Sequence, residues 1–299
     1  MNKRKILLIT PNLKGMKGGV NRIQPSLGVG YLAAVLEQKG YEVHVRDTAL
    51  EGYGRQVPLV GTNMVEIGEP EESVASYISN LKPDLVGISV LFSNLSEHAH
   101  TVARIVKGIN PNIRVVLGGN HITNAVRDYG FATACSQAEN IPHDLNDKNI
   151  DYAMIGESDF QFAKLAKALL NNQDPADMEG LVFRNKQGIV INKPTAKNKV
   201  DIRQLPHPAR HLMNMEGYFR IGLFHSSQAY SKRVLNVMTS RGCPERCSFC
   251  TTPAMWGNNI RWRDPEDVCS EIKNGIKQYG IGEVQFEDDS LTANIQHLM

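Results

Sequence analysis

The chain has 299 residues, of which 41% are hydrophobic and 21% are charged, the balance of an ordinary globular protein. Its 33 Lys and Arg residues nearly cancel its 31 Asp and Glu residues, so charge gives no support to a nucleic-acid-binding or membrane-surface role. No apolar run approaches the ~20 residues that a membrane-spanning helix needs; we therefore expect a cytoplasmic protein of one or two domains.

The first half of the chain alternates short apolar strands with helices. The expected strands cover residues 5–10, 41–46, 85–90, 113–117 and 152–155, and the expected helices cover 27–39, 97–109 and 158–170. This alternation predicts a parallel sheet covered on both faces, which is the Rossmann-like, doubly wound α/β fold. Ligands of such sheets bind beyond the carboxyl ends of the strands, so we expect a site in the loops there.

Three parts are expected along the chain. They are a Rossmann-like domain over 1–178, a hairpin and linker over 179–232, and a second domain over 233–299. The last part shows only two strand patterns, at 233–239 and 282–286, with one helix between them that starts after Asp264. Two parallel strands cannot close a core by themselves, so we expect this domain to be incomplete. The chain is then a fragment, a truncated gene product, or a chain completed by another.

Three of the five cysteines lie within eight residues, in a loop after the first of these two strands. Cys243, Cys247 and Cys250 have the spacing C-x3-C-x2-C, which in a cytosolic protein indicates metal binding or redox chemistry rather than disulfides. Thiolates ligate iron–sulfur clusters, and three ligands for four irons leave one iron open. The alternatives are a zinc site, with His211 or Cys269 as the fourth ligand, and a set of buried thiols.

At these cysteines the sequence resembles the radical S-adenosylmethionine superfamily, whose motif is C-x3-C-x-aromatic-C. Phe249 fills the aromatic position, and the flanking residues 239–244 also match. The resemblance implies a 4Fe–4S cluster on the three cysteines, an open iron that binds S-adenosylmethionine, and an electron donor such as flavodoxin or ferredoxin. It also implies that Phe249 lies near the adenine and that Asp288 or Asp289 lies at the S-adenosylmethionine site. A solvated acidic loop is the alternative for the two aspartates.

Three shorter motifs resemble the cobalamin-binding domain, in which Asp-x-His-x-x-Gly, Ser-x-Leu and Gly-Gly follow successive strands. The matching residues, in the same order, are Asp47 and Gly52, then Ser89 and Leu91, then Gly118 and Gly119. Glycines let a nucleotide tail approach the backbone closely, and a serine can hydrogen-bond it. The resemblance implies that these residues frame cobalamin. Ala49 replaces the motif's histidine, so we expect no histidine from this motif beneath the cobalt. His121 is a further candidate contact, with an ordinary loop histidine as the alternative.

The resemblance covers essentially the whole chain, since residues 25–32, 155–158 and 205–210 also match. It implies a cobalamin-dependent radical S-adenosylmethionine enzyme, with methylation of an unreactive carbon or phosphorus of a small molecule as the expected reaction. The alternatives are a radical cyclase or rearrangement enzyme acting on a tetrapyrrole or another natural product, a non-catalytic cofactor-binding module, and a zinc-stabilised binding protein. The second domain of that family is a partial (β/α) barrel, so the resemblance implies that residues 233–299 form only the start of such a barrel. This expected incompleteness puts the activity of the chain by itself in question. We expect neither a nucleic-acid nor a membrane partner.

Overall fold

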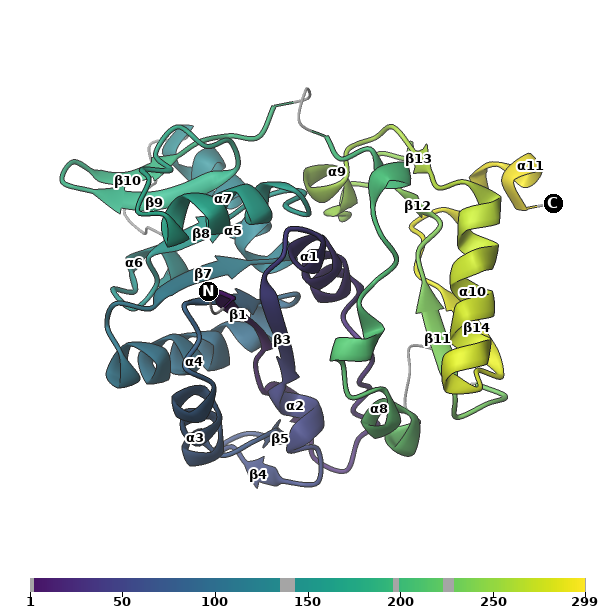
Figure 1. The fold of residues 1–299 in the computed structure, drawn as a ribbon, viewed down its shortest axis with the longest axis horizontal. Coiled ribbons are helices and arrows are strands. Elements are labelled where there is room, and N and C mark those ends of the chain that lie inside the picture. The colour runs from purple at the N-terminus through teal and green to yellow at the C-terminus, as the bar shows by residue number, and fades with distance from the viewer. Residues whose placement is uncertain (1–2, 135–142, 196–198, 223–228, 299) are drawn as a thin grey trace.

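The computed structural model describes residues 3–134, 143–195, 199–222 and 229–298. Its central feature is a seven-stranded sheet with the order β10-β9-β8-β7-β6-β1-β3 (Figure 1). The strands are β1 (Lys5–Thr10), β3 (Glu42–Asp47), β6 (Leu85–Ser89), β7 (Arg114–Gly118), β8 (Tyr152–Met154), β9 (Leu181–Asn185) and β10 (Gly188–Ile191). The first five are parallel, and their order of 2-1-3-4-5 along the sheet is a doubly wound arrangement.

Helices cover both faces of this sheet because its central strands are apolar on both sides. In β1, Leu7 and Ile9 enter one hydrophobic core, whereas Ile6 and Leu8 enter the other. The first core also receives α3 (Glu71–Leu81) and α4 (Ser96–Ile109), and the second receives α1 (Leu27–Gln38) and α7 (Gln161–Leu170). The doubly wound fold expected from the sequence is therefore confirmed, with element ends that differ from the expected ones by at most three residues.

The hairpin expected after residue 178 belongs to the same sheet. Strand β9 pairs antiparallel with β8, placing Val182 opposite Ala153, and β10 pairs antiparallel with β9. Leu181 and Val182 are buried. The sheet thus continues past the point at which the first domain is expected to end, because the apolar side chains of the hairpin join its two cores.

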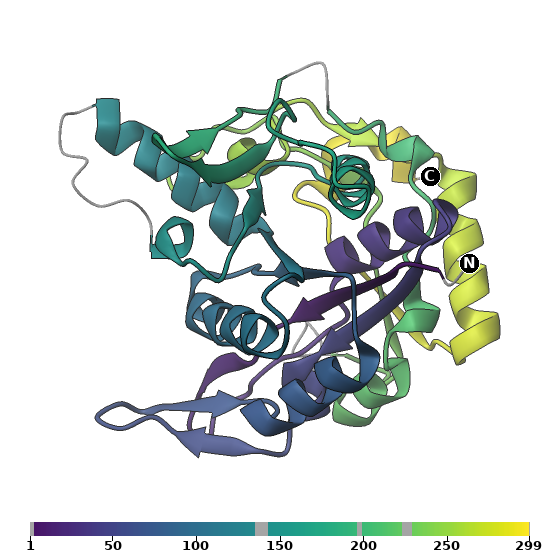
Figure 2. The same ribbon diagram turned by 60° about the vertical axis from the view of Figure 1, so that its left-hand side comes forward.

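A second, three-stranded antiparallel sheet is not expected from the sequence. It consists of β2 (Leu13–Met16), β5 (Met64–Ile67) and β4 (Gln56–Pro58). Both views place this small sheet at the end of the molecule opposite the β9–β10 hairpin (Figures 1 and 2). The remaining elements among the described residues up to 222 are the long helix α5 (Asn120–Ala134), the shorter helices α2 (Thr48–Glu51), α6 (His143–Asn146) and α8 (Met215–Ile221), and the 3-10 turns Ser93–Leu95, Ile202–Gln204 and Arg210–Leu212.

The last part of the chain contains a parallel strand pair joined by a helix. Strands β11 (Val234–Val237) and β14 (Glu283–Phe286) are connected through α10 (Pro265–Tyr279), as the sequence predicts. Asp264 immediately precedes α10, and Gly280 ends it in the left-handed conformation with φ 62°. The other elements are β12 (Ser240–Arg241), which pairs with β13 (Arg261–Trp262), then α9 (Thr252–Met255), the 3-10 turn Leu291–Ala293 and α11 (Ile295–Leu298).

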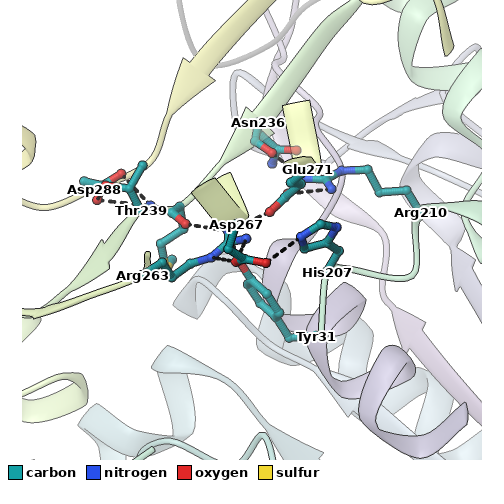
Figure 3. A network of polar contacts seen from close by, with 10 residues as sticks. Tyr31, His207, Arg210, Asn236, Thr239, Arg263, Asp267, Glu271 and Asp288 are labelled. Carbon is teal, nitrogen blue, oxygen red and sulfur yellow. Dashed lines mark hydrogen bonds and ion pairs between the residues drawn. The ribbon is translucent and has the colours of Figure 1, made fainter. Parts of the chain in front are cut away.

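A buried ionic network holds α10 against the first part of the chain (Figure 3). Glu271 of α10, whose side chain is 1% exposed, lies 2.6 Å from both Arg210 and Arg263. Arg263 donates to the Tyr31 hydroxyl of α1 at 3.3 Å, and Arg210 donates to the Asn236 carbonyl of β11 at 2.6 Å. Burial, and then the charge of Glu271, raise the pKa of Tyr31 to about 12. Glu271 thus pairs with two arginines from different segments, and Asp267 supplies a second carboxylate to Arg263 at 2.6 Å.

In the part of the chain that the structure describes, we find no helix that combines the length and the apolar character needed to cross a membrane.

Replacing Glu271 with Gln should strongly destabilise the protein. The change leaves Arg210 and Arg263 buried without the carboxylate they share, and breaking a buried ion pair from one side costs about 3–5 kcal/mol. Thermal and denaturant unfolding measure this loss. The matched control is Glu266→Gln, an exposed residue in the first turn of the same helix, whose effect should stay below about 1 kcal/mol. Equal losses for the two variants would contradict the central role of Glu271.

Candidate functional site

A cavity of about 120 Å³ lies at the carboxyl ends of β6, β7 and β8. Ser89 ends β6, Gly118 ends β7, and Gly119 follows it; all three line the cavity. Helices α1 and α7 supply apolar wall residues, and Met255 and Trp256 from the last part of the chain lie at the cavity as well. Most of the exposed lining is apolar, with a few polar groups among the lining residues, as in small-molecule sites generally.

Gly118 and Gly119 shape the cavity in different ways. Gly119 has φ +107°, and a Cβ atom there would lie 2.4 Å from the Val90 carbonyl oxygen. The backbone of the Val90 segment crosses at this point, since the Val90 amide donates to the Gly118 carbonyl at 2.8 Å. Gly119 is therefore required by backbone packing. A Cβ atom on Gly118 would meet no atom within 4 Å, so this glycine leaves open space.

Two other predicted cobalamin contacts, Leu91 and His121, are not among the residues that line the cavity. Leu91 is 46% exposed. His121 contacts the Ser93 hydroxyl at 2.9 Å and the Asp144 carboxylate at 3.0 Å. Burial alone would raise the pKa of Asp144, but hydrogen bonds from His100, His121 and Ser96 hold it well below its usual value. In this structure His121 is thus part of a separate polar cluster.

The Asp47–Gly52 segment also lies away from the cavity. Asp47 accepts a hydrogen bond from the Leu50 amide at 3.1 Å and one from the Tyr218 hydroxyl of α8 at 2.7 Å. Ala49 is 3% exposed and packs in the core that α8 and β11 share. A Cβ atom on Gly52 would lie 2.1 Å from the Gly68 backbone, so this glycine serves a close packing contact. Strand β3 lies at one edge of the sheet, next to β1 and apart from β6 and β7. Its carboxyl end therefore lies next to α8 and not beside the ends of β6 and β7.

The cysteine loop connects β12 to α9. Cys243 and Cys250 are partly exposed, Cys247 is exposed, and Phe249 is 88% exposed; all three cysteines are free thiols. Among the described residues, no three His, Cys, Asp or Glu side chains are gathered closely enough to share a metal ion. His211, the candidate fourth zinc ligand, is paired with Glu37 at 3.0 Å instead. The loop thus presents three accessible thiols that are adjacent in sequence but spread in space.

The two aspartates after β14 hold both ends of this loop. Asp288 accepts hydrogen bonds from the Thr239 amide and hydroxyl, the latter at 2.7 Å, and from the Ser240 hydroxyl at 2.5 Å. Asp289 accepts one from the Thr252 hydroxyl at 3.0 Å, and burial raises the pKa of Asp289. The sequence points to both residues, but it does not reveal that they anchor the segments before and after the cysteines.

Arg241 is a site residue that sequence reasoning did not select. Its side chain is 3% exposed, lines the cavity, and makes two hydrogen bonds to Asp159, at 2.7 and 3.0 Å. Burial alone would lower the pKa of Arg241, but Asp159 raises it above the usual arginine value. Beside it, Arg261 donates to Glu157 at 2.7 Å. One feature of the sequence could have pointed to Arg241: residues 155–158 and residues 239–244 both match the same protein family.

Residues 14–141 match the model of the B12 binding domain family. This part of the chain is thus similar to B12-binding domains, and we refer to it below as the B12-binding domain. It is 31% identical to the cytidylyl-2-hydroxyethylphosphonate methyltransferase of Streptomyces wedmorensis, in an alignment that covers 98% of this chain and 56% of the relative. It is 27% identical to the anaerobic magnesium-protoporphyrin IX monomethyl ester cyclase of Rubrivivax gelatinosus, covering 96% and 45%. The chain spans about half the length of the curated relatives it matches.

Solved structures share the fold of the B12-binding domain and of the segment after it. The radical S-adenosylmethionine methyltransferase TsrM from Kitasatospora setae matches with a TM-score of 0.66 at 19% identity, covering 97% of this chain and 49% of that chain. The cobalamin-dependent S-adenosylmethionine radical enzyme OxsB matches with a TM-score of 0.68 at 15% identity, covering 96% and 34%. The resemblance that the sequence motifs indicate, to cobalamin-dependent radical S-adenosylmethionine proteins, is confirmed.

Substituting Gly119 with Ala should destabilise the B12-binding domain by about 1–3 kcal/mol, because the new Cβ meets the Val90 carbonyl and the backbone conformation is unfavourable for alanine. The neighbouring Gly118→Ala is the matched control, since its Cβ enters open space; it should change the free energy of unfolding by less than about 1 kcal/mol. Thermal unfolding of the two variants checks the contrast, and similar melting temperatures would refute it.

The Asp47→Asn variant should change how stability depends on pH. Burial raises the pKa of Asp47 from 3.8 to about 6, although hydrogen bonds from Tyr218 and Leu50 oppose this rise. The native state therefore binds more protons than the unfolded state between these values, so the contribution of Asp47 to stability falls as pH rises through this window. The stability of Asp47→Asn relative to the parent protein should increase between about pH 4 and pH 6 and then level off. Denaturant titrations at several pH values measure this difference; a constant difference would show that the Asp47 pKa is not raised.

Proposed function

We propose that this chain is the cofactor-binding part of a cobalamin-dependent radical S-adenosylmethionine methyltransferase. The observation that carries the proposal is one juxtaposition: the cavity at the ends of β6 and β7 is bounded by residues that flank the cysteine loop. Two cofactor sites that meet in this way suit a reaction that needs both cofactors. The 31% identity to a methyltransferase over 98% of the chain supports the same reading.

The cavity fits the nucleotide tail of cobalamin. Its walls are largely apolar, as a planar heteroaromatic group requires, and its volume admits one such group rather than the whole cofactor. Ser89 supplies a hydroxyl for hydrogen bonding, and Gly118 leaves the backbone open to close approach. We assign no direct contact with the tail to four other residues, because each has another contact in this structure or lies outside the cavity lining. They are Asp47, Gly52, Leu91 and His121. Ala49 is buried beneath α8 and offers no imidazole to cobalt.

The cysteine loop fits a 4Fe–4S cluster by the chemistry of its donors. Cys243, Cys247 and Cys250 are free thiols that solvent reaches, so a cluster can assemble on them without unfolding the core. When bound, the cluster supplies the electron that cleaves S-adenosylmethionine, and cobalamin carries the methyl group to be transferred. In this proposal Asp288 and Asp289 position the loop, and the exposed Phe249 would cover the adenine. An electron donor such as flavodoxin or ferredoxin would approach this exposed side.

The substrate is a small molecule in this proposal, with an unreactive carbon or phosphorus as the methyl acceptor. A radical cyclase is the second candidate, because the chain is also 27% identical to a magnesium-protoporphyrin ester cyclase. The higher identity and coverage of the methyltransferase relative favour methyl transfer.

Anaerobic reconstitution tests the two cofactor sites. The protein should take up four irons and four sulfides per chain and retain cobalamin when hydroxocobalamin is added, as ultraviolet–visible spectra and metal analysis measure. Alanine variants of Cys243, Cys247 and Cys250 should each lose most of the iron. Cys269→Ala is the matched control, because this thiol is exposed on α10 outside the loop and its loss should leave the iron content unchanged.

The cofactor content and the products separate the candidate functions. Protein that binds iron but no cobalamin would rule out a cobalamin-dependent reaction. Protein that binds zinc in place of iron would rule out radical chemistry. Formation of 5′-deoxyadenosine from S-adenosylmethionine by the reconstituted protein would exclude the non-catalytic module.

A further inference from the structure

Both ends of the cysteine loop form part of the cavity wall in the B12-binding domain. We propose that Arg241 is a positioning residue that couples the two cofactor sites, so that cobalamin in the cavity and a cluster on the loop strengthen each other's binding. This inference rests on the proposed function. It concerns a property that neither site has alone, namely the dependence of one binding equilibrium on the other.

Arg241 is fixed from three sides. Two hydrogen bonds at 2.7 and 3.0 Å join its guanidinium to Asp159, in the loop after β8. The same guanidinium lies 4.6 Å from the centre of the Trp256 ring and 5.3 Å from that of Tyr31. A planar, bidentate group held in this way has one orientation, which a lysine cannot reproduce.

The backbone transmits the position of Arg241 directly to the first cysteine. Only Gly242 separates Arg241 from Cys243, and Gly242 has φ +104°, with Asn259 O only 2.5 Å from where its Cβ would lie. This junction therefore has little freedom to absorb a shift of Arg241. On the other side of the cysteines, Met255 and Trp256 line the same cavity. A ligand that fills the cavity thus meets the residues before and after the loop.

The charges at this contact make the arrangement sensitive to the cavity's occupant. Arg241 and Arg261 face Glu157 and Asp159, two positive against two negative side chains, and three of the four are at most 7% exposed. Glu157, Asp159 and Arg241 all line the cavity. Removing water from buried charges strengthens their attraction, so an occupant that displaces solvent should hold Arg241, and with it the loop, more firmly. Thermodynamic linkage requires the effect to be reciprocal.

The test is the affinity for hydroxocobalamin with and without the cluster. Equilibrium dialysis under anaerobic conditions gives the dissociation constant for cluster-loaded and cluster-free protein. The wild-type protein should bind about fivefold or more tightly when the cluster is present. In Arg241→Lys, which keeps the charge but loses the bidentate contact, this ratio should fall toward one. The matched control is Arg233→Lys, since Arg233 pairs with Glu216 at the surface and should keep the wild-type ratio.

A second readout tests the reciprocal effect. Bound hydroxocobalamin should slow the removal of iron by a chelator in the wild-type protein by a similar factor and have little effect in Arg241→Lys. A purely structural role for Arg241 would weaken cobalamin binding equally with and without the cluster and leave the ratio unchanged, which would overturn the proposal. If Arg241→Lys does not fold, the double variant Arg241→Met with Asp159→Asn removes both charges together, and the same loss of the ratio is expected.

Failure of the coupling differs visibly from failure of the proposed function. Wild-type protein that binds hydroxocobalamin with the same affinity in both states would overturn the coupling alone. Wild-type protein that binds no hydroxocobalamin in either state would overturn the proposed function and the coupling with it.

Discussion

The architecture depends on a carboxylate, Glu271, that has almost no access to water. A charge in that position is stable only if cations reach it. Arg210 of the linker and Arg263, which directly follows β13, provide them. Meeting this requirement brings α10, the linker and α1 together, because Arg263 also contacts Tyr31. The placement of the last part of the chain on the Rossmann-like sheet follows from this electrostatic constraint as much as from apolar packing.

Ion pairs between distant segments also occur at the cavity. Asp159 and Glu157 follow β8, and the arginines that neutralise them flank the segment with the cysteines. Charged residues of the first domain are thus paired with charged residues of the last part of the chain. This pairing explains why the cavity is bounded by both parts, and why its geometry belongs to the assembled chain rather than to the B12-binding domain alone.

Hydrophobic periodicity was enough to predict the sheet, since strands such as β1 are apolar on both faces and need no distant partner to be recognised. Ser89, Gly118 and Gly119 of the motifs Ser-x-Leu and Gly-Gly line the cavity, whereas Leu91 does not. Asp47 does not lie at this cavity, and spacing along the chain could not reveal this, because it does not show that β3 lies at an edge of the sheet or that α8 covers its end. The contact of Asp47 with cobalamin therefore stays a prediction. Arg241 escaped notice for a related reason: its partner Asp159 is 82 residues away, and only the fold brings the two together.

The attachment of Asp288 and Asp289 has a consequence for the entropy of the cysteine loop. These adjacent residues hold Thr239 and Ser240 on one side and Thr252 on the other, so the segment between them is already closed into a ring. Closing a flexible loop has an entropic cost that grows only slowly with its length, and most of it arises when the ends first meet. The native fold has incurred that cost before any metal arrives. Iron therefore has to order only the interior of the loop, which leaves more of the intrinsic strength of the thiolate–iron bonds available as net affinity.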